Sequence, residues 1–535
     1  MKKEKREESG AKGFMSGVLV LSLSTLIVKV IGLAFKIPML SILGTEGMGY
    51  FNSAYEIYAL LCIISTAGLP VALSIMISSA RAKGRGGEVR RIYRTARGIF
   101  LILGVCGSLF MLFFAEELAT LIGNPNARES ILAIAPALGF ICLASALRGY
   151  CQGFENMTPT AVSQLIEALS KLGLGVLFAL IALKRGYGIA RVSAFAVLGI
   201  TLGTLLSFVY LVFAKRSARH RIDDRLDGGR RGVGRELIGI ALPITLGSAV
   251  LGLTRIIDML LIMRRLQDTG MTVAQSNEIY GAYTTLALPV FSLVPALITP
   301  VAMALIPQLS SYASRCDALG ERYVVENAMR LTTIFAIPAS LGLSAFAKPV
   351  LELLFSGQSE AISISAPMLS VLGISVAFSC LITTTNAILQ SYRRVYLPII
   401  SMAAGVGVKL LVSYWLIGNP RIGAMGAPVG SLACNLTVTL INLWFMSRYS
   451  GLMLSVKRVF VLPLAASALS VGLAFAVYIW LGTGVSAFAL SALSAVVAYA
   501  LFSGLMKNVT AEDIDLLPFG DKILKFKNKY HSNGG

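Results

Sequence analysis

Charged side chains stand inside long apolar runs of this sequence, where lipid or protein is expected to surround them. Lys29 and Lys36 are seven residues apart, two helical turns, so both project from one helix face. Arg255 and Asp258 are three residues apart in a later run, close enough to pair on a helix. An ionisable group near the bilayer midplane costs about 2.5–3.5 kcal/mol on insertion scales and normally faces a partner or a water-filled cavity. These positions are therefore the first candidates for chemistry.

These two charged pairs each allow two interpretations. Arg255 and Asp258 form a purely structural ion pair, or Arg255 binds a substrate phosphate while Asp258 holds the guanidinium or meets a coupling cation. Lys36 points into a cavity together with Lys29, or it extends toward a lipid headgroup. We favour phosphate binding. Each of the two charged pairs lies in the first helix of its half of the chain, so their cations are expected to face each other.

Further ionisable residues lie in other apolar runs. Glu167 and Lys171 have the i, i+4 spacing, acid first, that favours an intrahelical ion pair, either structural or involved in coupling. Glu56 either pairs with Lys29 or Lys36 across the bundle, or it takes up and releases a proton as part of the coupling of transport. Lys409 is the only charged residue of its run, and an ammonium there could take the place of a coupling cation. Arg148, at the end of a run, contacts either a lipid headgroup or the substrate.

Together these groups carry more positive than negative charge, and a cationic cavity selects anions. The predicted substrate-binding set is Lys29, Lys36, Glu56, Arg148, Arg255, Asp258 and Lys409, with Glu167 and Lys171 as a separate pair. His220 and His531 are the only histidines, and the seven cysteines are scattered with no C-x-x-C motif. We therefore expect no metal site, no cofactor and no enzymatic activity.

The elements that carry these residues are predicted to be membrane-spanning helices. The chain has 535 residues, 56% of them hydrophobic and only 14% charged, too little polar surface for a water-soluble globule. Runs of about 20 apolar residues, the length that crosses a hydrocarbon core, recur between residues 14 and 506. We predict an all-α integral membrane protein with about fourteen spans: 14–43, 48–80, 91–114, 128–152, 159–183, 190–214, 236–264, 277–311, 323–347, 361–391, 396–417, 424–447, 457–481 and 484–506.

The distribution of Lys and Arg predicts the orientation. The net charge of +20 gathers in breaks and tails, at residues 1–13, 81–97, 215–235 and 507–535, whereas breaks of the other face such as 44–47 and 482–485 carry no Lys or Arg. By the positive-inside rule both termini are cytoplasmic, which requires an even number of spans. In this pattern the basic residues are topology signals, so no nucleic acid partner is expected.

The most polar interruption, 215–235, divides the chain into two lobes. Parallel repeats of this kind are a transporter architecture, with the substrate path between the halves. The predicted domains are a cytoplasmic tail (1–13), a first six-helix lobe (14–214), a cytoplasmic linker (215–235), a second six-helix lobe (236–450), two additional helices (451–506) and a cytoplasmic tail (507–535).

Several stretches of the chain together resemble the lipid II flippases of the MurJ and SpoVB type, in the multidrug/oligosaccharidyl-lipid/polysaccharide exporter superfamily. The likeness extends over nearly the whole length of the chain. The carrying stretches are Ser24–Leu33 (STLIVKVIGL), Lys36–Pro38 (KIP), Gly47–Tyr50 (GMGY), Leu147–Gly153 (LRGYCQG), Met157–Glu167 (MTPTAVSQLIE), Arg255–Asp258 (RIID) and Gly423–Ala427 (GAMGA).

The resemblance implies a V-shaped pair of six-helix lobes, two extra helices that form a groove for a polyprenyl tail, and alternating access. It also implies that Lys29, Lys36 and Arg255 match cations that line the family's cavity. The chain departs from the family pattern in having lysine where arginine is more usual in the first helix. It also lacks an acidic residue at the early second-helix position, where 50–52 fall.

The expected function is that of a flippase. It would move an undecaprenyl-diphosphate-linked cell-wall precursor, first of all lipid II, across the bacterial cytoplasmic membrane, as a monomer that contacts only this lipid-linked oligosaccharide and membrane lipids. Membrane potential or a monovalent cation would drive it. Alternatives are a flippase for another lipid-linked polysaccharide unit and a cation-coupled drug exporter, which should have an acidic cavity. A membrane glycosyltransferase would need a larger outer loop than residues 115–127.

Overall fold

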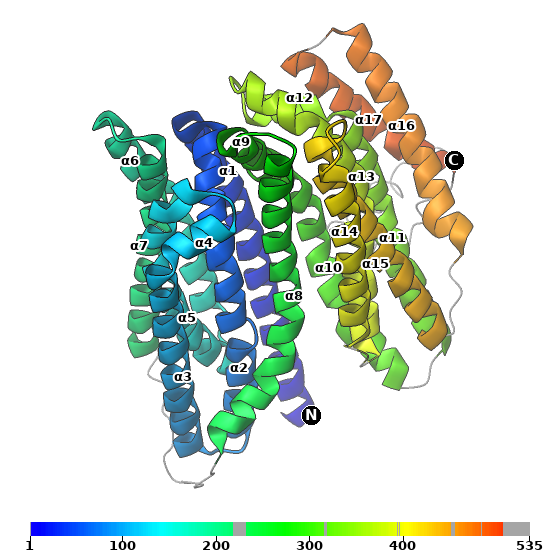
Figure 1. Ribbon diagram of the computed structural model, residues 1–535. Helices are drawn as coiled ribbons and strands as arrows, with labels where there is room; N and C mark the ends of the chain where they lie inside the picture. The colour runs from blue at the N-terminus through cyan, green and yellow to red at the C-terminus, as the bar shows by residue number, and fades with distance from the viewer. Residues whose placement is uncertain are drawn as a thin grey trace. The chain divides into compact units, whose positions relative to one another are not determined.

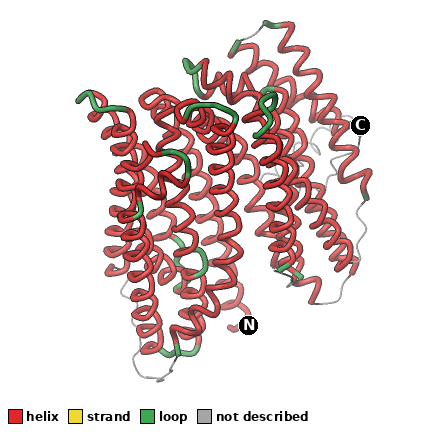
Figure 2. The backbone as a smooth tube through the Cα atoms, viewed as in Figure 1, coloured by secondary structure: helices red, strands yellow, loops and turns green. Residues whose placement is uncertain are grey.

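The computed structural model describes residues 2–217, 232–314, 318–392, 394, 396–450, 455–482 and 484–506, and every regular element among them is a helix (Figures 1 and 2). The helices are α1 (Lys2–Thr66), α2 (Leu69–Ala82), α3 (Gly86–Phe113), α4 (Ala115–Leu121), η1 (Pro125–Ala127), α5 (Arg128–Gly153), α6 (Thr158–Lys184), α7 (Ile189–Ser217), α8 (Val233–Asp268), α9 (Val273–Ala282), η2 (Tyr283–Ala287), α10 (Leu288–Ser314), α11 (Ala318–Ala345), α12 (Ala347–Leu354), α13 (Ser359–Ser391), α14 (Leu397–Ile417), η3 (Gly423–Met425), α15 (Gly426–Ser450), η4 (Lys457–Val461), α16 (Leu462–Trp480) and α17 (Val485–Leu505). Thirteen described stretches are long and apolar enough to cross a membrane. The predicted all-α membrane fold is confirmed.

Most of one predicted segment and the whole of another lie outside the described residues. They are residues 218–231 of the predicted linker and the predicted tail 507–535, which also contain both histidines. The predicted tail 1–13 belongs, from Lys2 onward, to α1.

The longest helix, α1, is two helical arms joined at Gly44. There the backbone has φ 65° and ψ −176°, a conformation that is essentially restricted to glycine. The rings of Phe35 and Phe51 are 5.5 Å apart, whereas 16 residues of straight helix rise about 24 Å, so the second arm folds back along the first. The 58-residue candidate span Ser24–Arg81 therefore contains two crossings, which are the predicted spans 14–43 and 48–80.

The chain forms two compact units. The first unit comprises residues 1–286 with 413–427, and the second comprises 287–412 with 428–535. The first unit thus includes α8 and α9, which sequence analysis had assigned to the second lobe. Small residues allow these helices to pack closely there. A Cβ atom on Gly281 of α9 would collide with the Thr45 carbonyl of α1, and one on Gly68 would collide with the Ala241 carbonyl of α8.

The second unit is held by apolar clusters and a few buried hydroxyls. The hydroxyl oxygens of Thr332 in α11 and Thr384 in α13 are hydrogen-bonded at 2.7 Å. The Ser340 hydroxyl of α11 donates to the Gly373 carbonyl of α13, also at 2.7 Å. The last two helices, α16 and α17, pack around the ring of Phe346 with Tyr478 and Phe488.

The reversal at Gly44 predicts a substitution effect that depends on backbone conformation alone. Gly44→Ala should destabilise the protein by about 1–3 kcal/mol, because an L side chain must be held in a glycine-only region. Gly32→Ala is the matched control, since a Cβ there would meet nothing within 4 Å on the first arm of α1. Reversible unfolding in mixed detergent micelles measures both. Equal stability of the two variants would contradict the assigned turn.

Candidate functional site

The reversal of α1 brings its own charges together. Lys36 lies on the first arm and Glu56 on the second, and the two side chains interact electrostatically although twenty residues separate them. Lys29 lies two turns before Lys36 and is exposed on the surface of the first unit. The first unit therefore holds two lysines and a carboxylate within one helical hairpin.

Helix α8 adds the next two predicted residues to this group. Its Gly252 allows it to pack on the second arm of α1, where a Cβ would lie 3.0 Å from Leu60 and 3.1 Å from Ile63. One turn further, Arg255 is exposed and interacts electrostatically with both Lys29 and Glu56. Asp258 also lies within electrostatic range of Glu56. Residues more than 200 positions apart thus form one charged cluster.

Helix α6 contributes Lys171, whose ammonium lies in an aromatic cage. Its Nζ atom is 4.9 Å from the ring centroid of Phe35, 5.5 Å from that of Phe51 and 4.7 Å from that of Tyr55. Glu167 and Glu56 are its carboxylate neighbours. The three ring faces hold the ammonium by cation–π attraction, so it bridges α6 and both arms of α1.

Glu167 and Arg148 form an ion pair that the sequence analysis did not predict. The Arg148 guanidinium donates to the Glu167 carboxylate at 3.0 Å and to the hydroxyls of Ser163 and Ser207 at 2.9 and 3.1 Å. The side chains are 12% and 28% exposed. The Nε and Nη2 atoms of Arg148 thus donate to α6 and α7, because a mostly buried guanidinium needs acceptors within the protein. The predicted contact of Arg148 with substrate or a lipid headgroup stays a prediction. Glu167 is shared between Arg148 and Lys171 rather than pairing within its own helix alone.

We name the charge cluster by its six members: Lys29, Lys36, Glu56, Lys171, Arg255 and Asp258. Four are cationic and two are acidic, so the cluster has a positive excess, and the Arg148–Glu167 pair beside it is neutral as a whole. Such a group attracts anions, and phosphate oxygens suit both lysine point charges and the arginine fork. No described group of three or more His, Cys, Asp or Glu side chains could hold a metal ion.

Lys409 is the one member of the predicted set in the second unit. It lies on α14 and is buried, with 7% of its surface exposed. Its proposed relation to the substrate stays a prediction.

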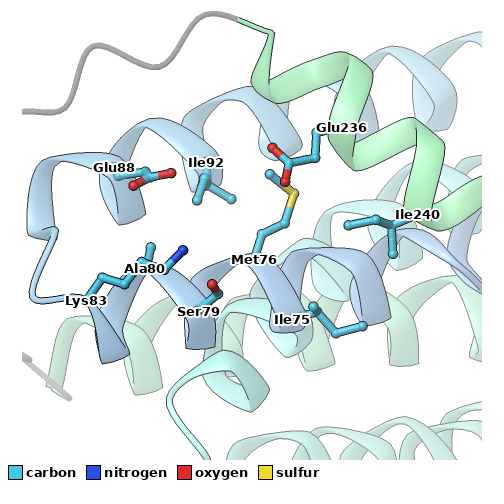
Figure 3. A pocket seen from close by; sticks show the side chains of 9 residues that line it. All are labelled: Ile75, Met76, Ser79, Ala80, Lys83, Glu88, Ile92, Glu236 and Ile240. Carbon is cyan, nitrogen blue, oxygen red and sulfur yellow. The ribbon is translucent and has the colours of Figure 1, made fainter.

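A separate hollow lies at the end of α2 and at the starts of α3 and α8. Figure 3 shows Glu88 and Glu236 on opposite sides of it, with Lys83 at its edge, and apolar side chains such as Met76 and Ile92 complete the lining. The Glu88 carboxylate is paired with the Arg85 guanidinium at 3.4 Å, so the hollow has no surplus of positive charge that would favour phosphate.

The polar partners that hold the cluster were not predicted from the sequence. The Lys36 ammonium donates to the Thr284 carbonyl at 2.5 Å, and the Asn52 amide donates to the hydroxyls of Thr284 and Thr285 at 2.9 Å each. The signal was present as two threonines and an asparagine inside apolar runs. Because neutral polar residues are common in membrane helices, that signal alone could not identify them.

Comparison with known proteins supplies the family. A family model described as polysaccharide biosynthesis protein matches residues 14–313, more than half of the chain. The chain belongs to this family. Stage V sporulation protein B of Bacillus subtilis (strain 168) is 26% identical over 455 residues, which cover 83% of this chain and 86% of that protein. Lipid II flippase MurJ of the same organism is 24% identical over 488 residues, covering 87% and 88%.

A solved structure supports the same fold. Lipid II flippase MurJ in an inward closed conformation matches with a TM-score of 0.70 and 15% identity, covering 91% of this chain and 98% of that chain. At this identity the likeness shows the fold alone. Together with the apolar spans, it establishes a multi-pass membrane protein.

Replacing one member of the Arg148–Glu167 pair should destabilise the protein more than replacing both members with apolar residues. Glu167→Leu should cost about 2–3 kcal/mol, at or below the lower end for a buried pair because the side chains are partly exposed, since it leaves the Arg148 guanidinium between helices without its carboxylate. The double substitution Arg148→Met with Glu167→Leu should recover much of that loss. Unfolding free energies of the four proteins in a double-mutant cycle measure the coupling. Simple additivity of the two single losses would contradict a direct pair.

Proposed function

We propose that this protein is a flippase that moves a lipid-linked polysaccharide precursor across the bacterial cytoplasmic membrane, with an undecaprenyl-diphosphate-linked sugar such as lipid II as substrate. The observation that carries the proposal is the positive charge cluster inside the membrane-spanning part of the first unit. Family membership and the likeness to MurJ and Stage V sporulation protein B support it.

Within the cluster, we assign the diphosphate to Lys29, Lys36 and Arg255. Lys29 and Arg255 are exposed side chains that repel each other, and an anion placed near both relieves that repulsion. The carboxylates of Glu56 and Asp258 offset part of the positive charge of the cluster when no anion is bound. The lysine ammonium is a strongly hydrated point charge, and the guanidinium adds two parallel donors that suit paired phosphate oxygens.

The competing interpretation is a cation-coupled drug exporter. A site for cationic drugs requires an acidic surplus, whereas four of the six cluster residues are basic. The charge balance therefore favours an anionic cargo over a cationic drug.

The drive that fits this chemistry is the membrane potential, with both termini in the cytoplasm. An inside-negative potential favours outward movement of an anionic headgroup, and it favours the return of a positively charged protein site. The energy is about 2.3 kcal/mol per charge for each 100 mV.

Neutral substitutions test the substrate site. Lys29→Gln and Arg255→Gln should each reduce transport about 10–100-fold, because each removes a charge-assisted hydrogen bond worth roughly 1.5–3 kcal/mol. Lys184→Gln is the matched control, since Lys184 is an exposed lysine at the end of α6. The measurement is movement of a fluorescent polyprenyl-diphosphate sugar in proteoliposomes. Transport at the control level in both variants would remove the cluster from the mechanism.

Depletion of the protein in its own host tests the substrate class. We expect one undecaprenyl-diphosphate-linked precursor to accumulate in the cytoplasmic leaflet. Accumulation of lipid II assigns the protein to peptidoglycan synthesis, and accumulation of another lipid-linked sugar assigns it to a different polysaccharide. Unchanged precursor pools combined with raised drug sensitivity would support the exporter instead.

A potassium diffusion potential tests the drive. In proteoliposomes with valinomycin, a potential that is negative on the cytoplasmic side of the protein should accelerate outward movement of the diphosphate lipid, and the reverse potential should slow it. Collapse of proton and sodium gradients should leave this acceleration in place. Transport that follows a cation gradient and ignores the potential would contradict the proposed drive.

A further inference from the structure

The Lys36 ammonium is tied to a backbone carbonyl that belongs to a π turn. Its Nζ atom donates at 2.5 Å to the carbonyl oxygen of Thr284, in the five-residue turn η2 that joins α9 to α10. A carbonyl inside an α-helix already accepts from the N–H four residues further on, so a side chain is at most its second donor. The turn therefore needs an explanation.

A proline explains why this carbonyl accepts a side chain. In π geometry the partner of residue 284 is the N–H of residue 289, and residue 289 is Pro289, which has none. The other π turn in the described residues, η4, stands in the same relation to Pro463, which also follows the last residue of its turn by two positions. The sequence thus frees one carbonyl at a fixed place in the helix.

Asn52 holds the turn from the other side. Its amide donates to both threonine hydroxyls of the turn at 2.9 Å, and the Thr284 hydroxyl in turn donates to the Tyr280 carbonyl at 2.7 Å. Asn52 is buried, as is Thr285. Lys36 from the first arm of α1 and Asn52 from the second arm consequently meet on one turn.

The charges around Lys36 indicate what its hydrogen bond to the Thr284 carbonyl does. Lys171 and Arg255 repel the ammonium and Glu56 attracts it. A lysine side chain with four rotatable bonds, left to these forces alone, would be drawn into an ion pair with Glu56 and would present fewer donors to an anion. The Thr284 carbonyl instead uses one N–H of three and fixes the ammonium in place.

We propose that Asn52 and the π turn are positioning elements for the phosphate site: they hold Lys36 through the Thr284 carbonyl so that its two remaining N–H donors face the substrate diphosphate. The proposal rests on the proposed function, because it assumes that Lys36 contacts a phosphate. Asn52 acts through Lys36 and does not itself touch the substrate. Pre-organisation of this kind raises affinity without adding a contact.

Two substitutions disturb the turn by different routes. Asn52→Ala removes both hydrogen bonds to the threonines, and Pro289→Ala supplies the missing N–H that pairs the free carbonyl. Each should weaken binding of geranylgeranyl diphosphate to the purified full-length protein about 5–20-fold. Asn126→Ala is the matched control, because the Asn126 amide donates to the Tyr50 hydroxyl at 3.1 Å and does not contact Lys36.

The decisive measurement repeats each substitution in a Lys36→Gln background. If the turn acts only through Lys36, Asn52→Ala and Pro289→Ala should have no further effect on the dissociation constant there, whereas any effect of the control should be the same in both backgrounds. In a Lys29→Gln background, which keeps Lys36 and its bond to the Thr284 carbonyl, both turn substitutions should retain their full effect.

Two outcomes would overturn the inference. One is an equal loss of affinity for the turn variants with and without Lys36, which would mean a general structural role. The other is unchanged affinity in Asn52→Ala and Pro289→Ala while Lys36→Gln loses binding, which would leave the proposed function intact. Failure of the wild-type protein to bind any polyprenyl diphosphate would instead contradict the proposed function itself.

Discussion

Holding positive side chains in an apolar solvent is the constraint on which the first unit depends. A lysine or arginine at bilayer depth costs about 2.5–3.5 kcal/mol on insertion scales, so each must find an acceptor, a ring face or water. Lys171 has three aromatic rings, Lys36 has a carbonyl, and Arg148 has a carboxylate and two hydroxyls. Lys29 and Arg255 are exposed, and they are the members best placed to meet an anion.

The reversal at Gly44 makes this arrangement possible. A continuous helix would place Lys36 and Glu56 about 30 Å apart. Folding the second arm back along the first brings Glu56 to the lysines and brings Phe51 and Tyr55 to Lys171. The same second arm presents Asn52 to the threonines of η2. One glycine in a conformation that other residues avoid therefore assembles contributions from both arms, α6, α8 and the π turn.

Sequence patterns were sufficient for the helices and for most of the charged residues. Spanning length and the polar breaks placed 128–152 and 159–183 within one residue of α5 and α6 at each end. The rarity of charge in apolar runs identified all six cluster residues. In contrast, the short helices α4 and α12 were not predicted, because seven or eight residues give too little periodicity. Both begin with an alanine that follows a phenylalanine, at Phe114 and Phe346, a repeat that spans alone do not reveal.

The partners of the charged side chains could not be predicted from the sequence. Glu167 with Lys171 fits the local i, i+4 rule, but tertiary packing gives Glu167 to Arg148 as well, nineteen residues away. The rule describes an isolated helix, and neighbouring helices bring competing donors. The carbonyl of Thr284 is invisible to any search for charged side chains, since every residue has a carbonyl and only Pro289 marks this one.

The central claim is that the lysines of α1 bind a diphosphate within the first unit. The most direct test is a ³¹P–¹⁵N distance measurement by solid-state NMR, on ¹⁵Nζ-lysine-labelled protein in bilayers with bound geranylgeranyl diphosphate. We expect a contact within hydrogen-bonding range that Lys36→Gln removes in part and Lys29→Gln with Lys36→Gln removes entirely. A phosphorus–lysine contact that persists unchanged in the double variant would contradict the account.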